Sequence, residues 1–552
     1  MRLNFANYEK RLPYFLILVF IMLAVYNLFY PGISIDEATD GIVAKNIFRN
    51  PPSYFSKDFF FPAILFLTFS NKIFPIMQDT YLGAVVSYLI LPFSLIFGWN
   101  VFSLRLTSIC ISALSILLIY FFCKLWFGRN AALLTTLLIS INLLFVQYSR
   151  VGLYREEIFI IFFFWAGLLF LAKYSQMKKN IFLYLSFYFW GVGFSTKITF
   201  LWYAIGIILA FTFLGRKINL LASLNIKKSV IALFSFCLGA LFIIIYNIKH
   251  PWGTVKLLLH SLLYAPAGKK DAMINNLAYL TNLKIRISDL ILFLNETIPE
   301  RVDWGIAEVS SVEFIASLIC ILTIISITLV LIMVLSSHNL QEIIRYRMLF
   351  LYAIYLTVFF LSPFTVSGFS PGHLMVLFPF PQIILAFLLN CIWQRIRQNR
   401  LIAIAICSSF LIPYLLFNVW MNIYFNSEME KSGGSKRWST SIYELADYLQ
   451  KNKITSPIMF GWGLRENLFF LTDGTVMPVI YDENFQGSIS EKYDCLLTKE
   501  KTYFYLTMNS EENLAYRNKF MLLARERGKE KILEKVFYNQ QGKPVYWLFK
   551  IS

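Results

Sequence analysis

The amino-acid sequence predicts an α-helical polytopic membrane protein of about eleven transmembrane helices, followed by a small C-terminal α/β domain. Three observations support this fold class. Hydrophobic residues make up 58% of the 552 residues and charged residues only 15%, which excludes an ordinary soluble globular protein. Apolar runs of about 20 residues, the length that crosses a bilayer, recur as far as residue 420. In the tail beyond residue 420, short strand-like runs alternate with helical patterns.

The predicted spans are apolar runs that end at polar or charged residues. They lie near residues 13–30, 101–123, 130–148, 157–173, 181–196, 199–214, 229–246, 312–335, 347–363, 373–392 and 401–420. The first follows Lys10 and Arg11 and lacks a small-residue cleavage site, so we interpret it as an uncleaved anchor. Two further apolar stretches, 59–70 and 80–97, do not show by themselves whether they cross the membrane.

The net charge of +18 indicates the topology, because short cytoplasmic loops are enriched in Lys and Arg. If both ambiguous stretches stay on the outer face, the inner loops carry 17 cations and two acids, and +15 of the net charge lies there. A crossing by residues 80–97 would remove this asymmetry. We therefore predict 11 spans in a protein of the plasma (inner) membrane, with a cytoplasmic N-terminus and an extracytoplasmic C-terminus. The excess charge is then a topology signal, and no nucleic-acid partner is expected.

This topology divides the chain into a transmembrane domain, 1–420, and an extracytoplasmic α/β domain, 421–552. The transmembrane domain has three external segments, 31–100, 149–157 and 247–311. The third contains apolar stretches and lysines, which is typical of an amphipathic segment that lies along the membrane interface. Six of the seven cysteines lie in or beside apolar runs and none forms a CxxC pair, so we expect small buried hydrophobes.

Candidate catalytic residues follow the first span. Ser34 and Glu37 have the spacing of a capping box, which predicts that a helix begins there. Asp36 then falls in the first helical turn, where unpaired N–H groups and the helix dipole favour a carboxylate. Asp36 is therefore a candidate general base beside the membrane surface. An ordinary acidic helix start accounts for these residues equally well.

Cations predicted on the same side of the membrane are candidate ligands of a phosphate. They are Arg105, Arg150, Lys197 and His373. Arginine offers fork-shaped donors that suit a phosphate, and several cations together would neutralise its charge. Taken singly, Arg105, Lys197 and His373 each fit a snorkelling or interfacial residue better. The loop that holds Arg150 and Glu156 also fits a local ion-pair cluster that caps two helices.

A resemblance to a known family runs through these residues. The Asp36-Glu37 pair directly after the first span resembles the signature of membrane glycosyltransferases of the GT-C class. Further matches are Tyr81-Leu82-Gly83-Ala84, Leu91-Pro92-Phe93, Ser103-Leu104-Arg105-Leu106, Leu125-Trp126-Phe127-Gly128, Tyr148-Ser149-Arg150 and Ser195-Thr196-Lys197. They cover residues 13–215, with a weaker match near 371–381. The chain most resembles the glycosyltransferase family 39-like enzymes, which include protein O-mannosyltransferases, lipid A aminoarabinose transferases and the RgtA/B/C/D-like group.

The resemblance implies a GT-C-like fold and an enzyme that moves a hexosyl or pentosyl unit from a polyprenyl-phosphate donor to an acceptor hydroxyl on the extracytoplasmic face. The acceptor would belong to a lipid, a glycan or a protein. Asp36 would be the general base, Glu37 would assist it or only cap the helix, and Glu156 best matches the acid of the second loop. We expect a single inverting displacement without a covalent intermediate.

The resemblance also bears on the cations and on cofactors. Arg105 and Lys197 match positions near the carrier phosphate, whereas His373 stands where relatives often have Arg-Tyr. The sequence requires no cofactor, but the three candidate acids leave room for a divalent metal.

Other function classes stay open on the sequence alone. A transporter or lipid flippase would carry ionisable residues in mid-span and broken helices at matching positions in two halves. This chain keeps its ionisable residues near the ends of the spans, which argues against that class. A polymerase or ligase of cell-envelope polysaccharide would use the same lipid-linked substrates. A non-catalytic assembly subunit would tolerate the loss of Asp36.

Overall fold

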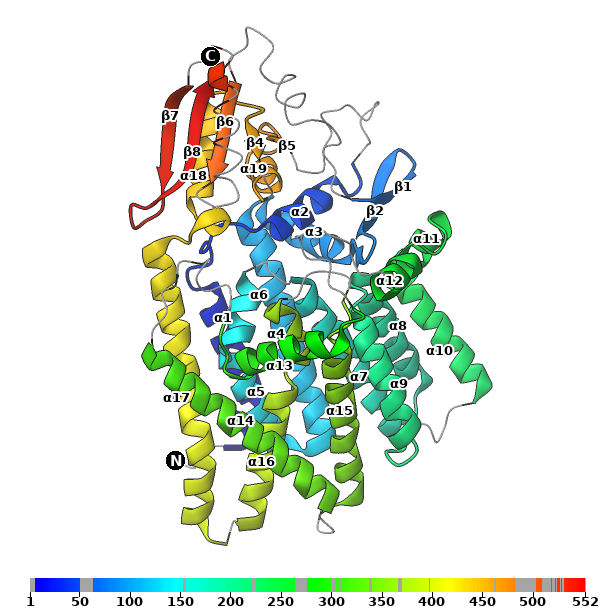
Figure 1. Cartoon of the computed structure of the whole chain (residues 1–552). Coiled ribbons are helices and arrows are strands. Elements are labelled where there is room, and N and C mark those ends of the chain that lie inside the picture. Colours follow the sequence, from blue (N-terminus) through cyan, green and yellow to red (C-terminus); the bar gives the residue numbers. More distant parts are fainter. Residues whose placement is uncertain are drawn as a thin grey trace.

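A computed structural model of the chain shows a helical bundle with a smaller α/β unit at one end (Figure 1). The structure describes residues 5–49, 63–151, 155–220, 225–263, 276–298, 304, 306, 310–336, 340–365, 370–396, 398–460, 463–481, 503–508, 518, 522, 524–526, 528 and 531–551. Helices dominate the described chain, in agreement with the predicted fold class.

The bundle consists of helices and bent helix pairs at the positions of the predicted spans. They are α1 (Phe5–Val25), α4 (Val101–Phe127), α5 (Arg129–Ile141), α6 (Leu143–Arg150), α7 (Arg155–Met177), α8 (Asn180–Thr196), α9 (Phe200–Leu214), α10 (Ile226–Gly239), α11 (Leu241–Lys249), α14 (Ser310–Ser336), α15 (Glu342–Leu361), the 3-10 helix η2 (Pro371–Leu377), α16 (Phe380–Ile396) and α17 (Arg400–Ser432). Five of the described helices are long and apolar enough to cross a membrane, and three bent pairs raise this number to eight. The total of 11 spans stays a prediction.

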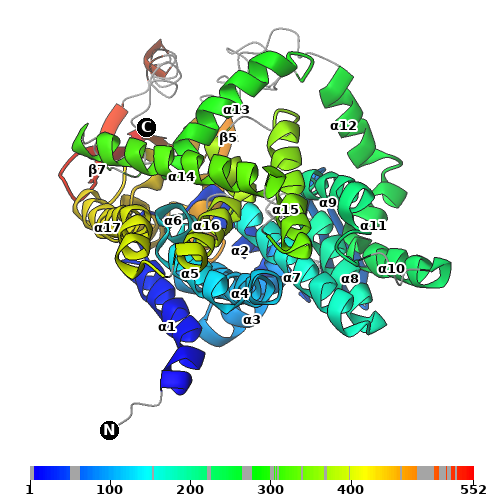
Figure 2. The ribbon, with the colours of Figure 1, turned by 90° about the horizontal axis from the view of Figure 1, so that it is seen from below.

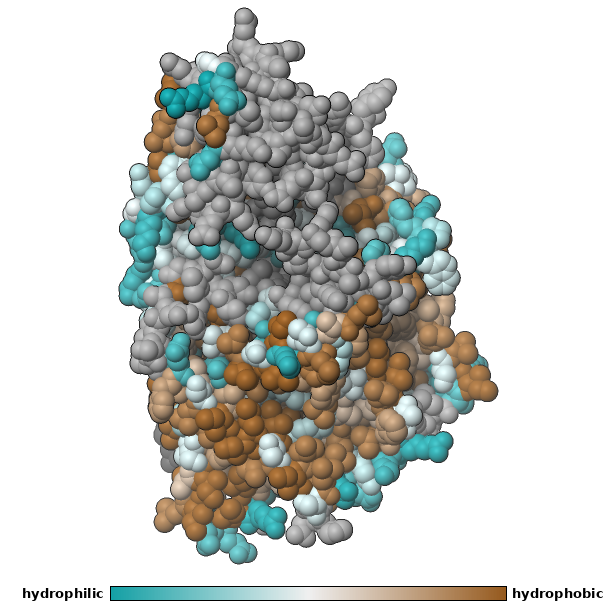
Figure 3. Space-filling view, viewed as in Figure 1, coloured by the Kyte–Doolittle hydropathy of each residue, from teal (hydrophilic) through white to brown (hydrophobic). Residues whose placement is uncertain are grey.

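The outer surface of the bundle is apolar. On α14, Phe314, Ile321 and Leu335 are exposed, and hydrophobic residues cover the lower part of the face in Figure 3. In a bilayer every backbone N–H and C=O must be satisfied within the protein, which a helix achieves by itself. Apolar side chains on the outside of such helices then contact lipid tails, which are as apolar as they are.

α5 and α6 form a bent pair, with an angle of 56° at the break next to Asn142. Asn418 Oδ1 accepts the backbone N–H of Leu143 at 2.7 Å, and Asn422 Nδ2 donates to the backbone oxygen of Ile141 at 2.9 Å. Both asparagines belong to α17. They satisfy backbone groups that the break leaves free, which apolar surroundings require.

Short elements lie on the end of the bundle nearest the α/β unit (Figure 1). They are α2 (Ile35–Asn46), α3 (Val85–Phe97) and an antiparallel sheet in the order β1 (Leu65–Phe69), β2 (Lys72–Asp79), β3 (Leu82–Gly83). α3 has 13 residues and is about 20 Å long. It is too short to cross a bilayer core of about 30 Å, in agreement with the interpretation of residues 80–97. The stretch 59–70 lies partly outside the described residues and ends in β1.

Two helices of the predicted interfacial segment lie along the outside of the bundle. They are α12 (Gly253–Leu263) and α13 (Tyr279–Leu294), and Figure 2 shows them in an arc with α14. α13 exposes Leu280 and buries Arg286, while its place along the membrane interface stays a prediction.

The C-terminal unit, which we define as residues 433–551, contains a five-stranded sheet in the order β5-β4-β6-β8-β7. Its elements are the 3-10 helix η3 (Lys436–Trp438), α18 (Ser441–Lys451), β4 (Ile458–Phe460), α19 (Arg465–Leu471), β5 (Val479–Tyr481), β6 (Tyr503–Met508), β7 (Lys531–Tyr538) and β8 (Pro544–Ile551). β4 is parallel to β5 and β6, whereas β8 is antiparallel to β6 and β7.

Two buried hydrophobic clusters organise the molecule. The larger one fills the bundle around Trp165. The smaller one joins α2 to the C-terminal unit, because Ile33 and Ile42 share it with Leu445 and Leu468. The C-terminal unit therefore packs on α2 in addition to its covalent connection through α17.

Candidate active site

α2 begins with the capping box that the sequence predicts. Ser34 Oγ accepts the N–H of Glu37 at 3.1 Å, and Glu37 Oε2 accepts the N–H of Ser34 at 2.8 Å. Asp36 is thereby the second residue of the helix, and it is half-buried. The free N–H groups and the dipole at this helix end favour the ionised carboxylate. The predicted helix start is confirmed, while the role of Asp36 as a base stays a prediction.

Glu37 is fully buried and forms a two-point ion pair with Arg105 of α4. Arg105 Nε donates to Glu37 Oε1 at 2.8 Å, and Nη2 donates to Oε2 at 3.1 Å. The other donors reach three backbone oxygens of the α1–α2 turn, which we define as residues 26–34, at 2.6, 3.0 and 3.2 Å. All five guanidinium N–H groups are thereby used. This geometry favours Arg105 as a support of the turn over Arg105 as a phosphate ligand.

Arg150, the last residue of α6, is also fully buried. Its guanidinium donates to the backbone oxygens of Asn27 and Tyr30 and to the side chain of Asn426 on α17. Arg150 and Arg105 therefore hold the α1–α2 turn from two different helices. Both guanidinium groups contact the α1–α2 turn, where their N–H groups donate hydrogen bonds to backbone carbonyl oxygens.

A second group of ionisable side chains forms around Glu157. Lys197 Nζ lies 2.5 Å from Glu157 Oε1, and His373 Nδ1 lies 2.7 Å from the same oxygen. Lys197 Nζ is also 3.9 Å from Glu156 Oε2. These residues come from the start of α7, the junction between α8 and α9, and η2. Lys197 and Glu157 are buried, so their opposite charges stabilise each other in surroundings of low polarity.

Two acids of α2 act on this group through their charges. Asp36 and Asp40 lie close enough to Glu156 for their charges to act on it. Asp40 is 1% exposed and accepts a hydrogen bond from Gln78 Nε2 at 2.7 Å. Gln78 also donates to Ser87 Oγ of α3 at 2.8 Å, so β2 and α3 fix the position of Asp40.

We call the combined set the acid–lysine cluster. Its members are Asp36, Asp40, Glu156, Glu157, Lys197 and His373. Four of the seven predicted site residues thus come together here. The other three, Glu37, Arg105 and Arg150, form the supporting group around the α1–α2 turn.

A backbone contact brings Lys197 to the acid–lysine cluster. Lys197 pairs with Leu82 in an isolated antiparallel bridge, and the N–H of Ile198 donates to the oxygen of Tyr81 at 3.0 Å. Gly83 is needed for this approach, because a Cβ at that position would collide with a backbone oxygen at the end of α8. The segment 81–84, which carries part of the family resemblance, therefore has a structural role in placing Lys197.

Tyr81 is a site residue that the sequence pattern alone does not single out. Burial raises the pKa of Tyr81 to about 12, Lys197 acts in the opposite direction, and Asp79, Glu156 and Asp36 add to the rise. The phenol therefore stays protonated near neutral pH and offers a hydrogen-bond donor beside the cluster. Its membership in a matching motif is the only sequence signal, because tyrosine is common in this chain.

Arg286 of α13 is a second residue that the sequence pattern does not single out. It is fully buried, and its Nη1 donates to Asp289 Oδ2 at 3.0 Å and to the backbone oxygen of Ser370 at 2.9 Å. Its charge acts on His373. α13 thereby brings a further cation to the edge of the acid–lysine cluster. The spacing of three residues between Arg286 and Asp289 is the only hint in the sequence.

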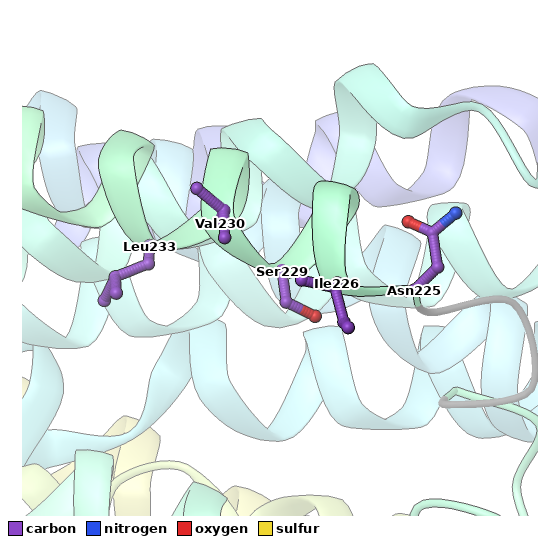
Figure 4. Close-up of a pocket in the computed structure, with 5 residues that line it drawn as sticks. All are labelled: Asn225, Ile226, Ser229, Val230 and Leu233. Carbon is purple, nitrogen blue, oxygen red and sulfur yellow. The ribbon is translucent and has the colours of Figure 1, made fainter.

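Metal-binding groups and surface depressions are two further features of a candidate site. Within the part of the chain that the structure describes, no group of three or more His, Cys, Asp or Glu side chains is arranged to hold a metal ion. A depression of about 460 Å³ on the outside of α10 is lined by Asn225, Ile226, Ser229, Val230 and Leu233 (Figure 4). No member of the acid–lysine cluster lines this depression, and its lining is mostly apolar.

Comparisons with known proteins agree with this architecture. Residues 83–247 match the sequence profile of the family described as dolichyl-phosphate-mannose-protein mannosyltransferase. The structure of ArnT from Cupriavidus metallidurans bound to undecaprenyl phosphate superimposes with a TM-score of 0.59, covering 98% of each chain at 11% sequence identity. The chain has a GT-C fold. Its predicted resemblance to GT-C membrane glycosyltransferases is therefore confirmed.

A second solved structure shares the GT-C fold. The oligosaccharyltransferase AglB from Archaeoglobus fulgidus, in complex with an inhibitory peptide and a dolichol-phosphate, superimposes with a TM-score of 0.50 at 14% identity. The alignment covers 94% of this chain and 72% of AglB. No curated protein sequence matches the chain. At these identities the likeness concerns the fold, and the assignment of residues depends on the geometry described above.

Proposed function

We propose that this chain is a membrane glycosyltransferase that moves a sugar from a polyprenyl-phosphate donor to an acceptor hydroxyl. The observation that carries the proposal is the Lys197–Glu157–His373 group beside Glu156, on which the charges of Asp36 and Asp40 act. This set offers a carboxylate that can act as a base and cations that can stabilise a phosphate leaving group, both of which the sugar transfer requires. The undecaprenyl phosphate and dolichol-phosphate in two structures of this fold support the donor class.

In the proposed reaction Asp36 accepts the proton of the acceptor hydroxyl while the hydroxyl oxygen attacks the anomeric carbon. A new carbon–oxygen bond forms as the bond from the anomeric carbon to the donor phosphate breaks. The electron pair of the broken bond leaves with the phosphate oxygen. A single displacement of this kind inverts the anomeric centre. Lys197 and Arg286 would stabilise the negative charge that develops on the phosphate.

The remaining residues are proposed to support these two roles. Glu157 holds Lys197 and His373 through one oxygen, so it fixes where the cation lies. Glu156 would assist Asp36 on the acceptor side, because it shares the electrostatic surroundings of that carboxylate. Glu37 and Arg105 would position the turn from which α2 begins.

The orientation in the membrane is also proposed. The N-terminus lies at the opposite end of the bundle from α2 (Figure 1), and the sequence assigns most of the positive charge to the N-terminal side. Under the rule that cytoplasmic loops are positive, the acid–lysine cluster and the C-terminal unit face the extracytoplasmic side. We propose the plasma (inner) membrane as the location.

The alternative functions assign different roles to the acid–lysine cluster. Three bent helix pairs occur among the described helices, as a transporter would need. However, the cluster residues lie in short helices or at the ends of longer ones and not in mid-span, which favours transfer chemistry over transport. A polysaccharide polymerase or ligase would use the same donor and the same base, and would differ in its acceptor.

The proposal is tested by replacing Asp36 with Asn, which keeps the shape and removes the base. Membranes that contain the wild-type or variant chain are supplied with a panel of polyprenyl-phosphate sugars, and transferred sugar is measured by mass spectrometry. We expect a loss of about 100- to 10,000-fold in rate. The control is Asp447→Asn, an exposed acid of α18 that pairs with Lys451 one turn further along the same helix. Full activity of Asp36→Asn would exclude the base assignment, and no transfer by the wild type with any donor would favour a transporter or a subunit.

A further inference from the structure

The C-terminal unit is hydrogen-bonded to Gly32 and Ile33, the two residues that precede the N-cap of α2. The N–H of Gly32 donates to the backbone oxygen of Trp438 at 2.7 Å. Asn467 Nδ2, on α19, donates to the backbone oxygen of Ile33 at 2.6 Å. Ser34, the N-cap of α2, follows directly. The C-terminal unit therefore holds the chain immediately before the helix that carries Asp36.

The packing around these bonds is close. A Cβ at Gly32 would collide with the backbone oxygen of Ser439, and a Cβ at Gly41 would collide with the ring of Phe470. α2 can thus rest against the C-terminal unit only because glycines face it at these two points. Small displacements of the unit would be transmitted to α2, since close-packed contacts leave no slack.

Asn467 makes the contact nearest to the helix start. Its side chain is 1% exposed, so the amide is buried between α19 and the α1–α2 turn. The carbonyl of Ile33 lies outside α2 and takes no part in the helical hydrogen bonds, which begin with the oxygen of Ser34. Asn467 gives this buried carbonyl a donor.

A connected set of bonds leads from Asn467 to the acid–lysine cluster. Asn467 holds Ile33, and the next residue, Ser34, forms the capping box with Glu37. Glu37 is in turn held by Arg105. Asp36 lies between Ser34 and Glu37, so both ends of its helical turn are fixed.

We propose that Asn467 is a positioning residue for sugar transfer, which makes the C-terminal unit part of the catalytic site. This inference rests on the proposed function, in which Asp36 is the base. Loss of the Asn467 bond would let the first turn of α2 shift relative to Lys197. The donor would still bind, because Asn467 is not among the groups proposed to hold the phosphate. The rate of the chemical step would fall.

The kinetic test uses Asn467→Asp in the full chain, because aspartate has the same shape and lacks the donor. We expect kcat to fall about 10- to 100-fold, since a displacement of about 1 Å at a reacting group has this effect. KM for the polyprenyl-phosphate sugar should stay within about twofold of the wild type, which is the signature of an interaction lost only in the transition state. An unchanged kcat, or a change confined to KM, would overturn the proposal.

A matched control separates positioning from a general effect on the C-terminal unit. Asn452 is an exposed asparagine at the end of α18 whose Nδ2 bonds only within that helix, to Tyr448. Asn452→Ala should leave both constants unchanged. If Asn467→Asp does not fold, Asn467→Leu is used in its place, because leucine has a similar shape and no donor.

Hydrogen–deuterium exchange tests the same contact without any transfer assay. In Asn467→Ala, amides of residues 32–38 should exchange about tenfold faster, while amides of α18 stay protected. Unchanged exchange at residues 32–38 would overturn the positioning role whatever the activity. A wild-type chain that transfers no sugar would instead contradict the proposed function, so the two failures are distinguishable.

Discussion

Lys197 Nζ lies 2.5 Å from Glu157 Oε1 in the buried part of the acid–lysine cluster. A buried ion pair of this kind gives little net stability relative to apolar residues, because both charges lose their hydration. Removing only one partner is different, because the other charge is then left without compensation in surroundings of low polarity. We therefore expect single and double variants of Lys197 and Glu157 to differ in their free energy of unfolding.

Lys197→Met and Glu157→Gln should each destabilise the protein by about 3–5 kcal/mol, because each leaves one buried charge unbalanced. The double variant Lys197→Met/Glu157→Gln should recover a large part of that loss, since neither charge remains. Thermal unfolding of the four chains in the same detergent measures the coupling. Losses that simply add in the double variant would show that the two side chains do not stabilise each other.

Arg105→Lys should lower kcat more than it changes donor KM. Lysine has three donors in place of five and no flat fork, so it cannot satisfy Glu37 and the three carbonyls of the α1–α2 turn together. We expect a loss of about 1–3 kcal/mol in stability, because lysine keeps the charge beside Glu37 but leaves buried carbonyls of the turn without donors. Steady-state kinetics with varied donor decide between the two roles of Arg105. A raised donor KM with unchanged kcat would restore the phosphate-binding role that the family resemblance implies.

The start of α2 could be predicted from the sequence because it depends on local spacing. Ser34 and Glu37 are three residues apart, and this spacing alone defines the capping box that the structure contains. The helical bundle could be predicted for a similar reason, since the length of an apolar run decides whether it can cross a bilayer.

The partners of the arginines could not be predicted in this way. Arg105 and Arg150 look like phosphate ligands in the sequence because a guanidinium suits phosphate and carbonyl groups alike. Whether a guanidinium group binds a phosphate or a carbonyl group depends on the path of residues 26–34. Contacts with α4, α6 and the C-terminal unit set that path. The positions of Tyr81 and Arg286 could not be predicted from the sequence either, because segments distant in the sequence bring these residues to the acid–lysine cluster.

Tyr81→Phe should lower kcat about 100-fold, because it removes a half-buried donor beside the acid–lysine cluster. Burial raises the pKa of Tyr81 to about 12, so the phenol keeps its proton throughout the neutral range. The ratio of wild-type to variant rates should therefore be constant between about pH 6 and pH 9. Tyr448→Phe, on the surface of α18, is the control. A ratio that falls with rising pH in this window would mean that Tyr81 titrates and is not a fixed donor.

We propose that the reaction proceeds without a metal, with Lys197 and Arg286 supplying the positive charge beside the leaving group. Transfer by the purified protein should therefore continue in excess EDTA. The measurement compares initial rates before and after dialysis against chelator, with Mg²⁺ and Mn²⁺ added back in separate samples. A rate that is lost with EDTA and restored by one of these ions would assign a divalent metal to the carboxylates of the cluster.

The burial of Glu296 leads us to expect a stability that decreases as the pH rises. It follows α13 and is 3% exposed, and Asn142 Nδ2 donates to its Oε1 at 2.6 Å. Burial raises the pKa of Glu296 from 4.5 to about 8, and hydrogen bonds from Tyr414, Asn418 and Asn142 offset this only in part. Between these two pH values the folded chain holds a proton that the unfolded chain has lost. The free energy of unfolding therefore falls as the pH rises through this window.

Glu296→Gln should remove this dependence, because glutamine keeps the hydrogen-bonding shape and does not ionise. The variant should resemble the wild type in stability near pH 5 and exceed it progressively up to about pH 8, beyond which the difference levels off. Melting temperatures of both chains in one detergent across this range measure the effect. A difference that stays constant with pH would mean that Glu296 is ionised in the folded protein, and its neighbours Asn142 and Tyr414 would then have to stabilise a buried charge.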